Sequence, residues 1–298
     1  MKRWVKIGGG TVAVLALLAG AAVFTGLRLA DTKMQRKVEV AVRPVAWSSD
    51  AAAVERGRYL YASRGCVDCH GANGGGRSFV EDGKGLRIRG PNISPGPGTV
   101  VASYRPDDWV RTIRHGVAPS GRPILVMPSE DYNRFTDADL SALVAYVKSL
   151  PPVAGEPGAV EFPLPVRVLY GFGAIQDAAS KIDHALAPAQ PVAEGVNLAH
   201  GAYVANMCLG CHGAQLAGGR IAGGPPDWPA ASNLTPGAGT VMTRYADADA
   251  LLRLFRTGKR PDGTPVQVMP FESLREMNET DVRALHLYLR TLQPRPQG

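Results

Sequence analysis

Cysteine is scarce in this chain of 298 residues, and none of it is spare. The four cysteines all belong to two Cys-x-x-Cys-His motifs, at residues 66–70 and 208–212. Nothing is left for a disulfide, a free nucleophile or a separate zinc site. Aromatic residues are also few, at 7%, whereas the chain has 35 glycines and 24 prolines. This composition favours small helical domains joined by long ordered loops over extended sheet.

A basic excess is missing from the globular part of the chain, although the net charge is +7. Residues 1–49 carry a net charge of +6, residues 50–150 carry +2, residues 151–193 carry −2 and residues 194–298 carry +1. Phosphate contacts need a basic surface, which neither half provides. Nucleic acid is therefore excluded as an expected partner.

Charge is also absent from residues 7–27, which follow Lys2, Arg3 and Lys6. A helix of this length spans roughly 31 Å, which matches the hydrocarbon core of a bilayer. A cleaved signal peptide is the rival interpretation, because Ala19-Gly20-Ala21 is an acceptable cleavage site. We favour a retained anchor over residues 1–30, since the apolar part of a signal peptide normally has about 7–15 residues.

The second half of the chain repeats the first. Cys66, His70, Met127 and Leu150 recur 142 positions later, as Cys208, His212, Met269 and Leu292. A repeat that preserves sulfur and imidazole at fixed spacing indicates a duplicated site as well as a duplicated fold.

Helix signals divide the chain into two helical domains, at residues 50–152 and 195–298. Ser49 or Asp50 can cap a helix over residues 51–63, and a second short helix is expected over residues 107–114. Thr136 with Asp139, and Asn278 with Asp281, have capping-box spacing before the last helix of each domain. Residues 31–49 form a juxtamembrane linker. A proline-rich connector over residues 153–194 contains one short helix near residues 166–175, expected to lie on the domains.

The two motifs predict two covalently bound haems of the c type. Cysteines three positions apart lie on one face of a helical turn, so that both thiols reach the vinyl groups of one haem while the next histidine faces the iron. We therefore assign Cys66, Cys69, Cys208 and Cys211 to haem attachment, and His70 and His212 to the iron. A zinc site would need closer cysteine pairs, and a thioredoxin-like pair would need a strand and helix context that is missing.

Methionine is the expected second axial ligand. Met127 and Met269 occupy equivalent positions and each precedes a proline, whereas Met242 and Met277 align with Val101 and Phe135. The histidines outside the motifs have no duplicated counterpart, so that they are not expected to bind iron.

Polar contacts to the haems are expected from repeated tyrosines and arginines and from Trp109. Haem propionates could accept hydrogen bonds from Tyr104, Trp109, Arg114, Tyr245 and Arg256. Solvated helix faces are the alternative interpretation of these side chains. The backbone carbonyl near Pro91 and that near Ser232 are expected to fix the other ring nitrogen of the two motif histidines.

Both halves resemble class I cytochromes c, in the group of membrane-anchored multihaem cytochromes that includes subunits of periplasmic alcohol, aldehyde and gluconate dehydrogenases. The likeness rests on Cys-x-x-Cys-His, the Pro91-Asn92-Ile93-Ser94-Pro95 stretch, Val-Met-Pro and the Asp-Leu-x-Ala-Leu-x-Ala-Tyr segment before Leu150. It implies an all-α fold of two tandem class I cytochrome c domains after one N-terminal transmembrane helix. Those dehydrogenase subunits typically carry three haems, whereas this chain has motifs for two.

The predicted function is electron transfer, without catalysis, between a periplasmic dehydrogenase or quinol-side donor and a terminal acceptor. Covalent haem attachment of this type takes place in the bacterial periplasm, so that the haem domains are expected there and the anchor in the inner membrane. The expected partners are redox proteins such as a dehydrogenase, an oxidase or a small cytochrome. One alternative is an integral dihaem subunit of a dehydrogenase or terminal oxidase. Another is a dihaem peroxidase or thiosulfate-oxidising enzyme, which two His/Met irons disfavour.

Overall fold

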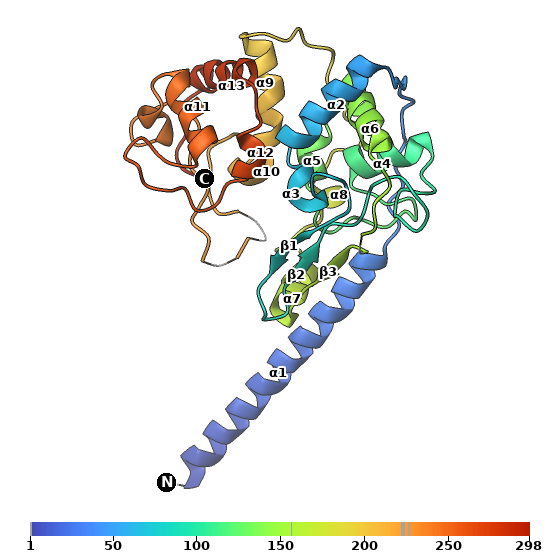
Figure 1. Ribbon diagram of the computed structural model, residues 1–298. Coiled ribbons are helices and arrows are strands. Elements are labelled where there is room, and N and C mark those ends of the chain that lie inside the picture. Colours follow the sequence, from blue (N-terminus) through green and yellow to red (C-terminus); the bar gives the residue numbers. More distant parts are fainter. Residues whose placement is uncertain (1, 156, 222–223, 226) are drawn as a thin grey trace.

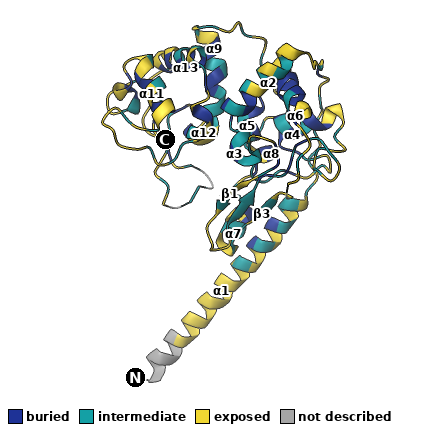
Figure 2. Ribbon diagram, viewed as in Figure 1, coloured by how far each residue is buried: buried dark blue, intermediate teal, exposed yellow. Residues whose placement is uncertain are grey.

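The computed structural model describes residues 2–155, 157–221, 224–225 and 227–298, with only the backbone described for residues 2–8. Two helical lobes lie side by side, and helix α1 (Lys2–Gln35) extends away from them (Figure 1). Most described side chains along the free part of α1 are exposed (Figure 2). Over residues Gly9–Gln35, α1 is long and apolar enough to cross a bilayer, and it is the one such helix among the described residues.

The first lobe contains the predicted helices α2 (Ala51–Ser63), α4 (Pro106–His115) and α6 (Asp137–Ser149), with the motif turn as α3 (Cys66–His70). It also contains the short helix α5 (Ser129–Tyr132), which was not predicted. Asp50 caps α2 by accepting a hydrogen bond from the Ala53 N–H at 2.8 Å, which decides between the two predicted caps. A separate hydrophobic core forms beneath these helices, from residues that include Leu60, Trp109 and Leu140.

The second lobe has a corresponding order of elements. They are α9 (Leu198–Ala205), η1 (Asn206–Cys208), α10 (Leu209–His212), η2 (Val241–Arg244), α11 (Ala248–Thr257), α12 (Phe271–Leu274) and α13 (Glu279–Thr291). Its core is a second cluster that includes Val204, Leu254 and Leu285. Each half of the chain therefore buries its own apolar side chains.

The first and last helices of each lobe cross at a glycine. A Cβ atom added to Gly57 of α2 would lie 1.9 Å from the Ala142 carbonyl oxygen of α6, and one added to Gly201 of α9 would lie 2.1 Å from that of Ala284 in α13. Only a residue without a side chain permits this approach. The crossing is thus duplicated along with the sequence.

Two equivalent sets of hydrogen bonds join the lobes, one set for each copy of the repeat. The Tyr59 hydroxyl of the first lobe donates to the Asp281 carboxylate at 2.6 Å and accepts from the Asn278 N–H at 3.2 Å. Tyr203 of the second lobe bonds Asp139 at 2.6 Å and the Thr136 N–H at 3.3 Å in the same way. Each tyrosine therefore contacts both the first N–H and the carboxylate at the start of the last helix of the other lobe.

Thr136 and Asn278 do cap α6 and α13 by accepting from the N–H three residues on. The N–H of each cap residue, however, donates to a tyrosine hydroxyl of the other lobe and not to the carboxylate three residues later. These carboxylates instead accept hydrogen bonds from the Tyr203 and Tyr59 hydroxyls. The predicted capping boxes are therefore only half correct.

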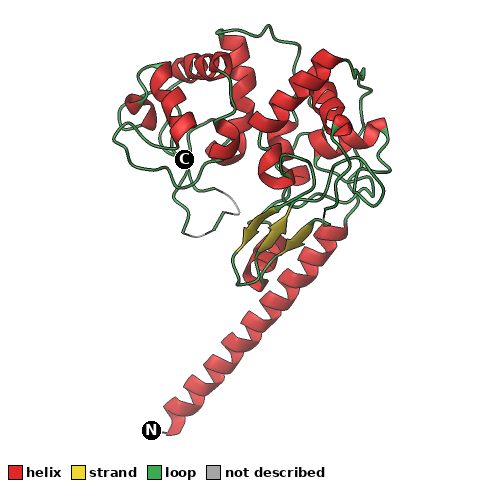
Figure 3. Cartoon of the chain, in the orientation of Figure 1, coloured by secondary structure: helices red, strands yellow, loops and turns green. Residues whose placement is uncertain are grey.

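A small antiparallel sheet is a feature that the all-α prediction lacks (Figure 3). Strand β2 (Arg87–Arg89) lies between β1 (Ser78–Glu81) and β3 (Ala159–Glu161), so that the connector adds a strand to a hairpin of the first lobe. The connector helix is α7 (Leu164–Phe172), followed by α8 (Ala178–Lys181). Its existence is confirmed, but its predicted position was wrong, since α7 packs on α1 and not on the lobes.

Candidate functional site

The first Cys-x-x-Cys-His motif forms the one-turn helix α3, between Gly65 at φ 86° and Gly71 at φ 71°. Glycine is required at both ends because these backbone angles lie in the left-handed region. The second motif occupies η1 and α10 and ends at Gly213, at φ 77°. In both lobes a short, sharply bounded helix thus presents two thiols and a histidine together.

A backbone carbonyl fixes each motif histidine, as the sequence predicts. His70 Nδ1 lies 2.9 Å from the Pro91 carbonyl oxygen, and His212 Nδ1 lies 2.7 Å from that of Ser232. Because a carbonyl only accepts, Nδ1 carries the proton and Nε2 keeps its lone pair for a metal ion. Burial lowers the pKa of both imidazoles, which favours the neutral form that binds metals.

A cleft in the first lobe brings the motif and Met127 together. Cys66, Cys69 and His70 line it, and so do Met127 and Pro128 from the loop before α5. The cleft has a cavity volume of about 200 Å³ and opens to solvent at its mouth. The histidine and the methionine thus line one open cleft, as the two ligands of a metal ion at the centre of a flat cofactor would.

The remaining walls of this cleft are largely apolar. Aliphatic side chains from several elements contribute, among them Ile93, Val101, Ile113, Leu143 and Val147. Ile88 and Val160, which are cross-strand partners in the small sheet, line the cleft as well. Sequence reasoning missed these two residues. The alternation Arg87-Ile88-Arg89 was the available signal, but it is too short to identify a strand.

One buried polar group on the cleft wall indicates what the site would bind. Within the described residues, the indole N–H of Trp109 is buried and has no hydrogen-bond partner, although Trp109 lines the cleft. A buried donor without a partner is costly, and an acceptor on a bound group would remove that cost. The residues present thus fit a haem, whose propionates are such acceptors. Tyr104 also lines the cleft, and its hydroxyl lies 3.3 Å from the Thr112 hydroxyl.

The thiols are not set up for thiolate chemistry. Burial, with the neighbouring Cys69 and Asp68, raises the pKa of Cys66 to about 12, and burial raises that of Cys69 to about 11. In the second motif, burial raises the pKa of Cys208 to about 12. Neutral thiols are poor nucleophiles and poor metal ligands, which disfavours a redox-active dithiol.

The two arginines predicted to contact haem have another role. Arg114 is buried, donates to the Phe135 carbonyl oxygen at 2.7 Å and pairs with Asp137 at 2.8 Å, and it does not line the cleft. Arg256 donates to the Met277 carbonyl oxygen at 3.0 Å. Phe135 and Met277 are themselves equivalent in the repeat, so that both arginines hold the loop before the last helix. Arg114 therefore does not face the first cleft, whereas the haem contact of Arg256 stays a prediction.

In the second lobe, the equivalent methionine lies beside the hydrophobic core. Met269 packs against the second core and is partly buried, whereas Met242 and Met277 are fully buried members of that core. Tyr245 is buried there too, and its carbonyl oxygen lies 2.9 Å from His286 Nε2.

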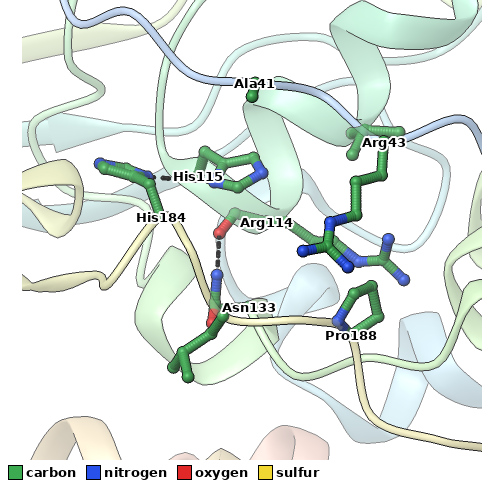
Figure 4. Close-up of a pocket in the computed structure, with 9 residues that line it drawn as sticks. Ala41, Arg43, Arg114, His115, Asn133, His184 and Pro188 are labelled. Atoms are coloured by element: carbon green, nitrogen blue, oxygen red, sulfur yellow. Dashed lines mark hydrogen bonds between the residues drawn. The ribbon is translucent and has the colours of Figure 1, made fainter.

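The histidines outside the motifs have structural partners. Figure 4 shows His115 facing His184, with the two Nδ1 atoms 3.0 Å apart. His200 lies 2.7 Å from the buried Asp281 carboxylate. Burial, with nearby positive groups, lowers the pKa of His115 to about 4, so that this imidazole is neutral at pH 7.

Residues 52–147 match the profile of the family described as cytochrome C oxidase, cbb3-type, subunit III. Residues 52–147 thus contain a cytochrome c domain. The chain resembles several curated cytochrome subunits of dehydrogenases.

The chain is 25% identical to the fructose dehydrogenase cytochrome subunit of Gluconobacter japonicus, covering 94% of this chain and 60% of that protein. It is 29% identical to the gluconate 2-dehydrogenase cytochrome c subunit of Pantoea cypripedii, over 81% of this chain and 60% of that one. The corresponding values for the quinone alcohol dehydrogenase cytochrome c subunit of Gluconobacter oxydans are 26%, 85% and 57%. The chain therefore spans about 60% of the length of these relatives.

Proposed function

We propose that the chain is a dihaem electron-transfer cytochrome, the redox subunit of a periplasmic dehydrogenase complex. The observation that carries this proposal is the cleft in which Cys66, Cys69 and His70 meet Met127. The recurrence of these residues 142 positions later as Cys208, Cys211, His212 and Met269 supports a second haem.

The residues of each lobe would share the work of holding the haem. The two cysteines attach it, and the histidine binds its iron through Nε2 because Nδ1 is held by a backbone carbonyl. The methionine would be the second protein ligand of the iron, and the aliphatic walls of the first cleft would exclude water. When bound, a haem supplies a one-electron couple whose potential a His/Met ligand pair raises. An iron held by both residues would have no place for a substrate.

The domains in this proposal keep the predicted boundaries: an anchor at residues 1–30, cytochrome c domains at 50–152 and 195–298, and a linker and a connector at 31–49 and 153–194. α1 would cross the inner membrane once and hold both lobes on the periplasmic side, where haem of this type is attached. The long apolar helix supports the membrane crossing.

The number of haems is the first test. The purified full chain should gain the mass of two haems, and a pyridine haemochrome assay should give two haems of the c type per chain. A gain of one haem would restrict the proposal to the first lobe.

The second candidate function is an electron carrier that is not part of a complex. Both irons would have two protein ligands in either case, so that the site does not distinguish the two functions. The relatives named as dehydrogenase subunits favour the complex. Purification from native membranes in mild detergent distinguishes the two. A dehydrogenase subunit that co-elutes in constant ratio supports the complex, whereas a chain that elutes alone, with its haems intact, supports the carrier.

A further inference from the structure

The connector helix α7 carries an apolar face that the lobes leave uncovered. Leu164, Leu169 and Phe172 are 53%, 46% and 54% exposed, and Pro165 is exposed as well. At 3.6 residues per turn, these positions fall within an arc of roughly 140° on one side of the helix. The opposite side holds the buried Tyr170. A nine-residue helix of this kind is amphipathic.

Close packing holds α7 against α1. A Cβ atom added to Gly171 of α7 would lie 2.0 Å from the Gly26 carbonyl oxygen of α1. In turn, a Cβ atom added to Gly26 would lie 2.9 Å from both Val168 and Phe172. The two backbones therefore approach as closely as two glycines allow.

Polar bonds outside the apolar face fix this crossing. Arg36 of α1 forms a two-point ion pair with the buried Asp177 carboxylate, at 2.7 and 2.8 Å. The Tyr170 hydroxyl donates to the same carboxylate at 2.6 Å. Arg167 of α7 pairs with Asp31 of α1 at 2.6 Å. At 3.6 residues per turn, Arg167 and Tyr170 fall outside the arc of Leu164, Leu169 and Phe172, so that the apolar face carries none of these polar bonds.

The level of the crossing along α1 identifies what covers that face. Gly26 is the last residue but one of the uncharged run over residues 7–27, and Arg28, Asp31 and Lys33 follow it. Below the crossing, the described side chains of α1 are uncharged and nearly all exposed, Leu18 and Phe24 among them. The apolar face of α7 is therefore continuous with the surface of α1 that would face lipid, at the height where the hydrocarbon core ends.

We infer that α7 lies in the plane of the membrane surface, with Leu164, Leu169 and Phe172 in the outer leaflet. In this position it is a second anchor, which fixes the height and tilt of the first lobe above the bilayer. In-plane amphipathic helices bury their apolar face roughly 5–10 Å into the boundary between headgroups and acyl chains. The inference rests on the proposed membrane anchoring by α1.

Spin labels in nanodiscs of phosphatidylcholine and phosphatidylglycerol test this position. The full haem-loaded chain carries its native cysteines as thioethers, so that one introduced cysteine is the only labelling site, and unlabelled wild type serves as the blank. Leu164→Cys and Leu169→Cys report on α7, and Leu18→Cys on α1 is the lipid control. Val196→Cys is the water control, because it is exposed and precedes α9, at the far end of the molecule from α1 (Figure 1). Wild-type haem spectra verify that each variant is folded.

The ratio of oxygen collisions to collisions with a water-soluble nickel complex distinguishes lipid from water. We expect the labels at positions 164 and 169 to give a ratio several-fold above that at position 196, as position 18 should. If only position 18 behaves as lipid-exposed, the anchor stands and the inference about α7 is wrong. If position 18 also resembles position 196, the anchoring by α1 itself fails. Low collision rates with both reagents at positions 164 and 169 would mean that protein covers α7, which also overturns the inference.

Discussion

The buried charge between the lobes gives the sharpest test of how they are held together. Asp281 is fully buried and accepts hydrogen bonds from Tyr59 and Arg64 of the first lobe and from His200 of its own. Arg64 is buried as well, and Asp281 is its ion-pair partner. Asp281→Asn would leave the Arg64 guanidinium buried without a counter-charge. Breaking a buried pair in this way costs about 3–5 kcal/mol.

The repeat supplies a matched control in Asp139. Asp139 bonds Tyr203 as Asp281 bonds Tyr59, but its cation is the partly exposed Arg56. The position equivalent to Arg64 is Asn206, which carries no charge. Asp139→Asn therefore leaves no buried charge unpaired, and we expect it to cost roughly 1–2 kcal/mol.

Urea unfolding of the full chain in mild detergent, followed by circular dichroism, measures both free energies. We expect Asp281→Asn to be about 1–4 kcal/mol more destabilising than Asp139→Asn, the difference between the two ranges above. Combining Arg64→Asn with Asp281→Asn removes both charges and should restore part of the stability. The reasoning would be refuted if both single variants lost the same free energy of unfolding. It would also be refuted if the double variant were less stable than Asp281→Asn.

The pKa of Asp281 predicts how the free energy of unfolding depends on pH. Burial alone would raise the pKa of Asp281, but the Arg64 charge and the hydrogen bonds outweigh it and lower the pKa to about 2. A carboxyl whose pKa is lowered on folding contributes stability above its unfolded pKa of about 3.9, and that contribution is lost as the pH falls toward 2. The contribution is about 2.5 kcal/mol at neutral pH. In acid titrations Asp281→Asn should lack this loss.

Three further predictions concern the axial ligands, the helix crossing and a buried histidine. Met127→Leu and Met269→Leu should each open one iron and create carbon monoxide binding at that haem alone, whereas Met242→Leu should leave the spectrum unchanged. Gly57→Ala should destabilise the first lobe by about 1–3 kcal/mol, because its Cβ atom would meet backbone; an unchanged melting temperature would contradict the crossing. The pKa of His115, lowered to about 4, predicts a loss of stability as the pH falls from about 6.5 toward 4; His115→Gln should abolish that loss in unfolding measured across this range.

Local signals predicted the helices well because the residues that end a helix act within one turn. Asp50, Thr136 and Asn278 were read as caps from the sequence, and each accepts the expected backbone hydrogen bond. The motif histidines were correctly paired with backbone carbonyls, since the repeat pointed to the same place twice. Whether Met127 and Met269 bind iron stays a prediction.

Contacts between distant segments were beyond the sequence. The small sheet was missed because strands of three or four residues carry too little pattern. The position of α7 depends on a glycine pair 145 positions apart, Gly26 and Gly171. Arg114, which was expected at the haem, does not line the first cleft, for a different reason. A duplication preserves structural contacts as faithfully as site contacts, so that repetition alone cannot separate the two.

Carbon monoxide binding to the reduced wild-type chain tests the central claim most directly. We propose that the chain holds two haems, each closed by a histidine and a methionine, and that it transfers electrons without acting on a substrate. We therefore expect low-spin spectra and no stoichiometric binding of carbon monoxide at either haem. Binding of one equivalent per chain in the untreated protein would show an open iron and would contradict the account in favour of an enzyme.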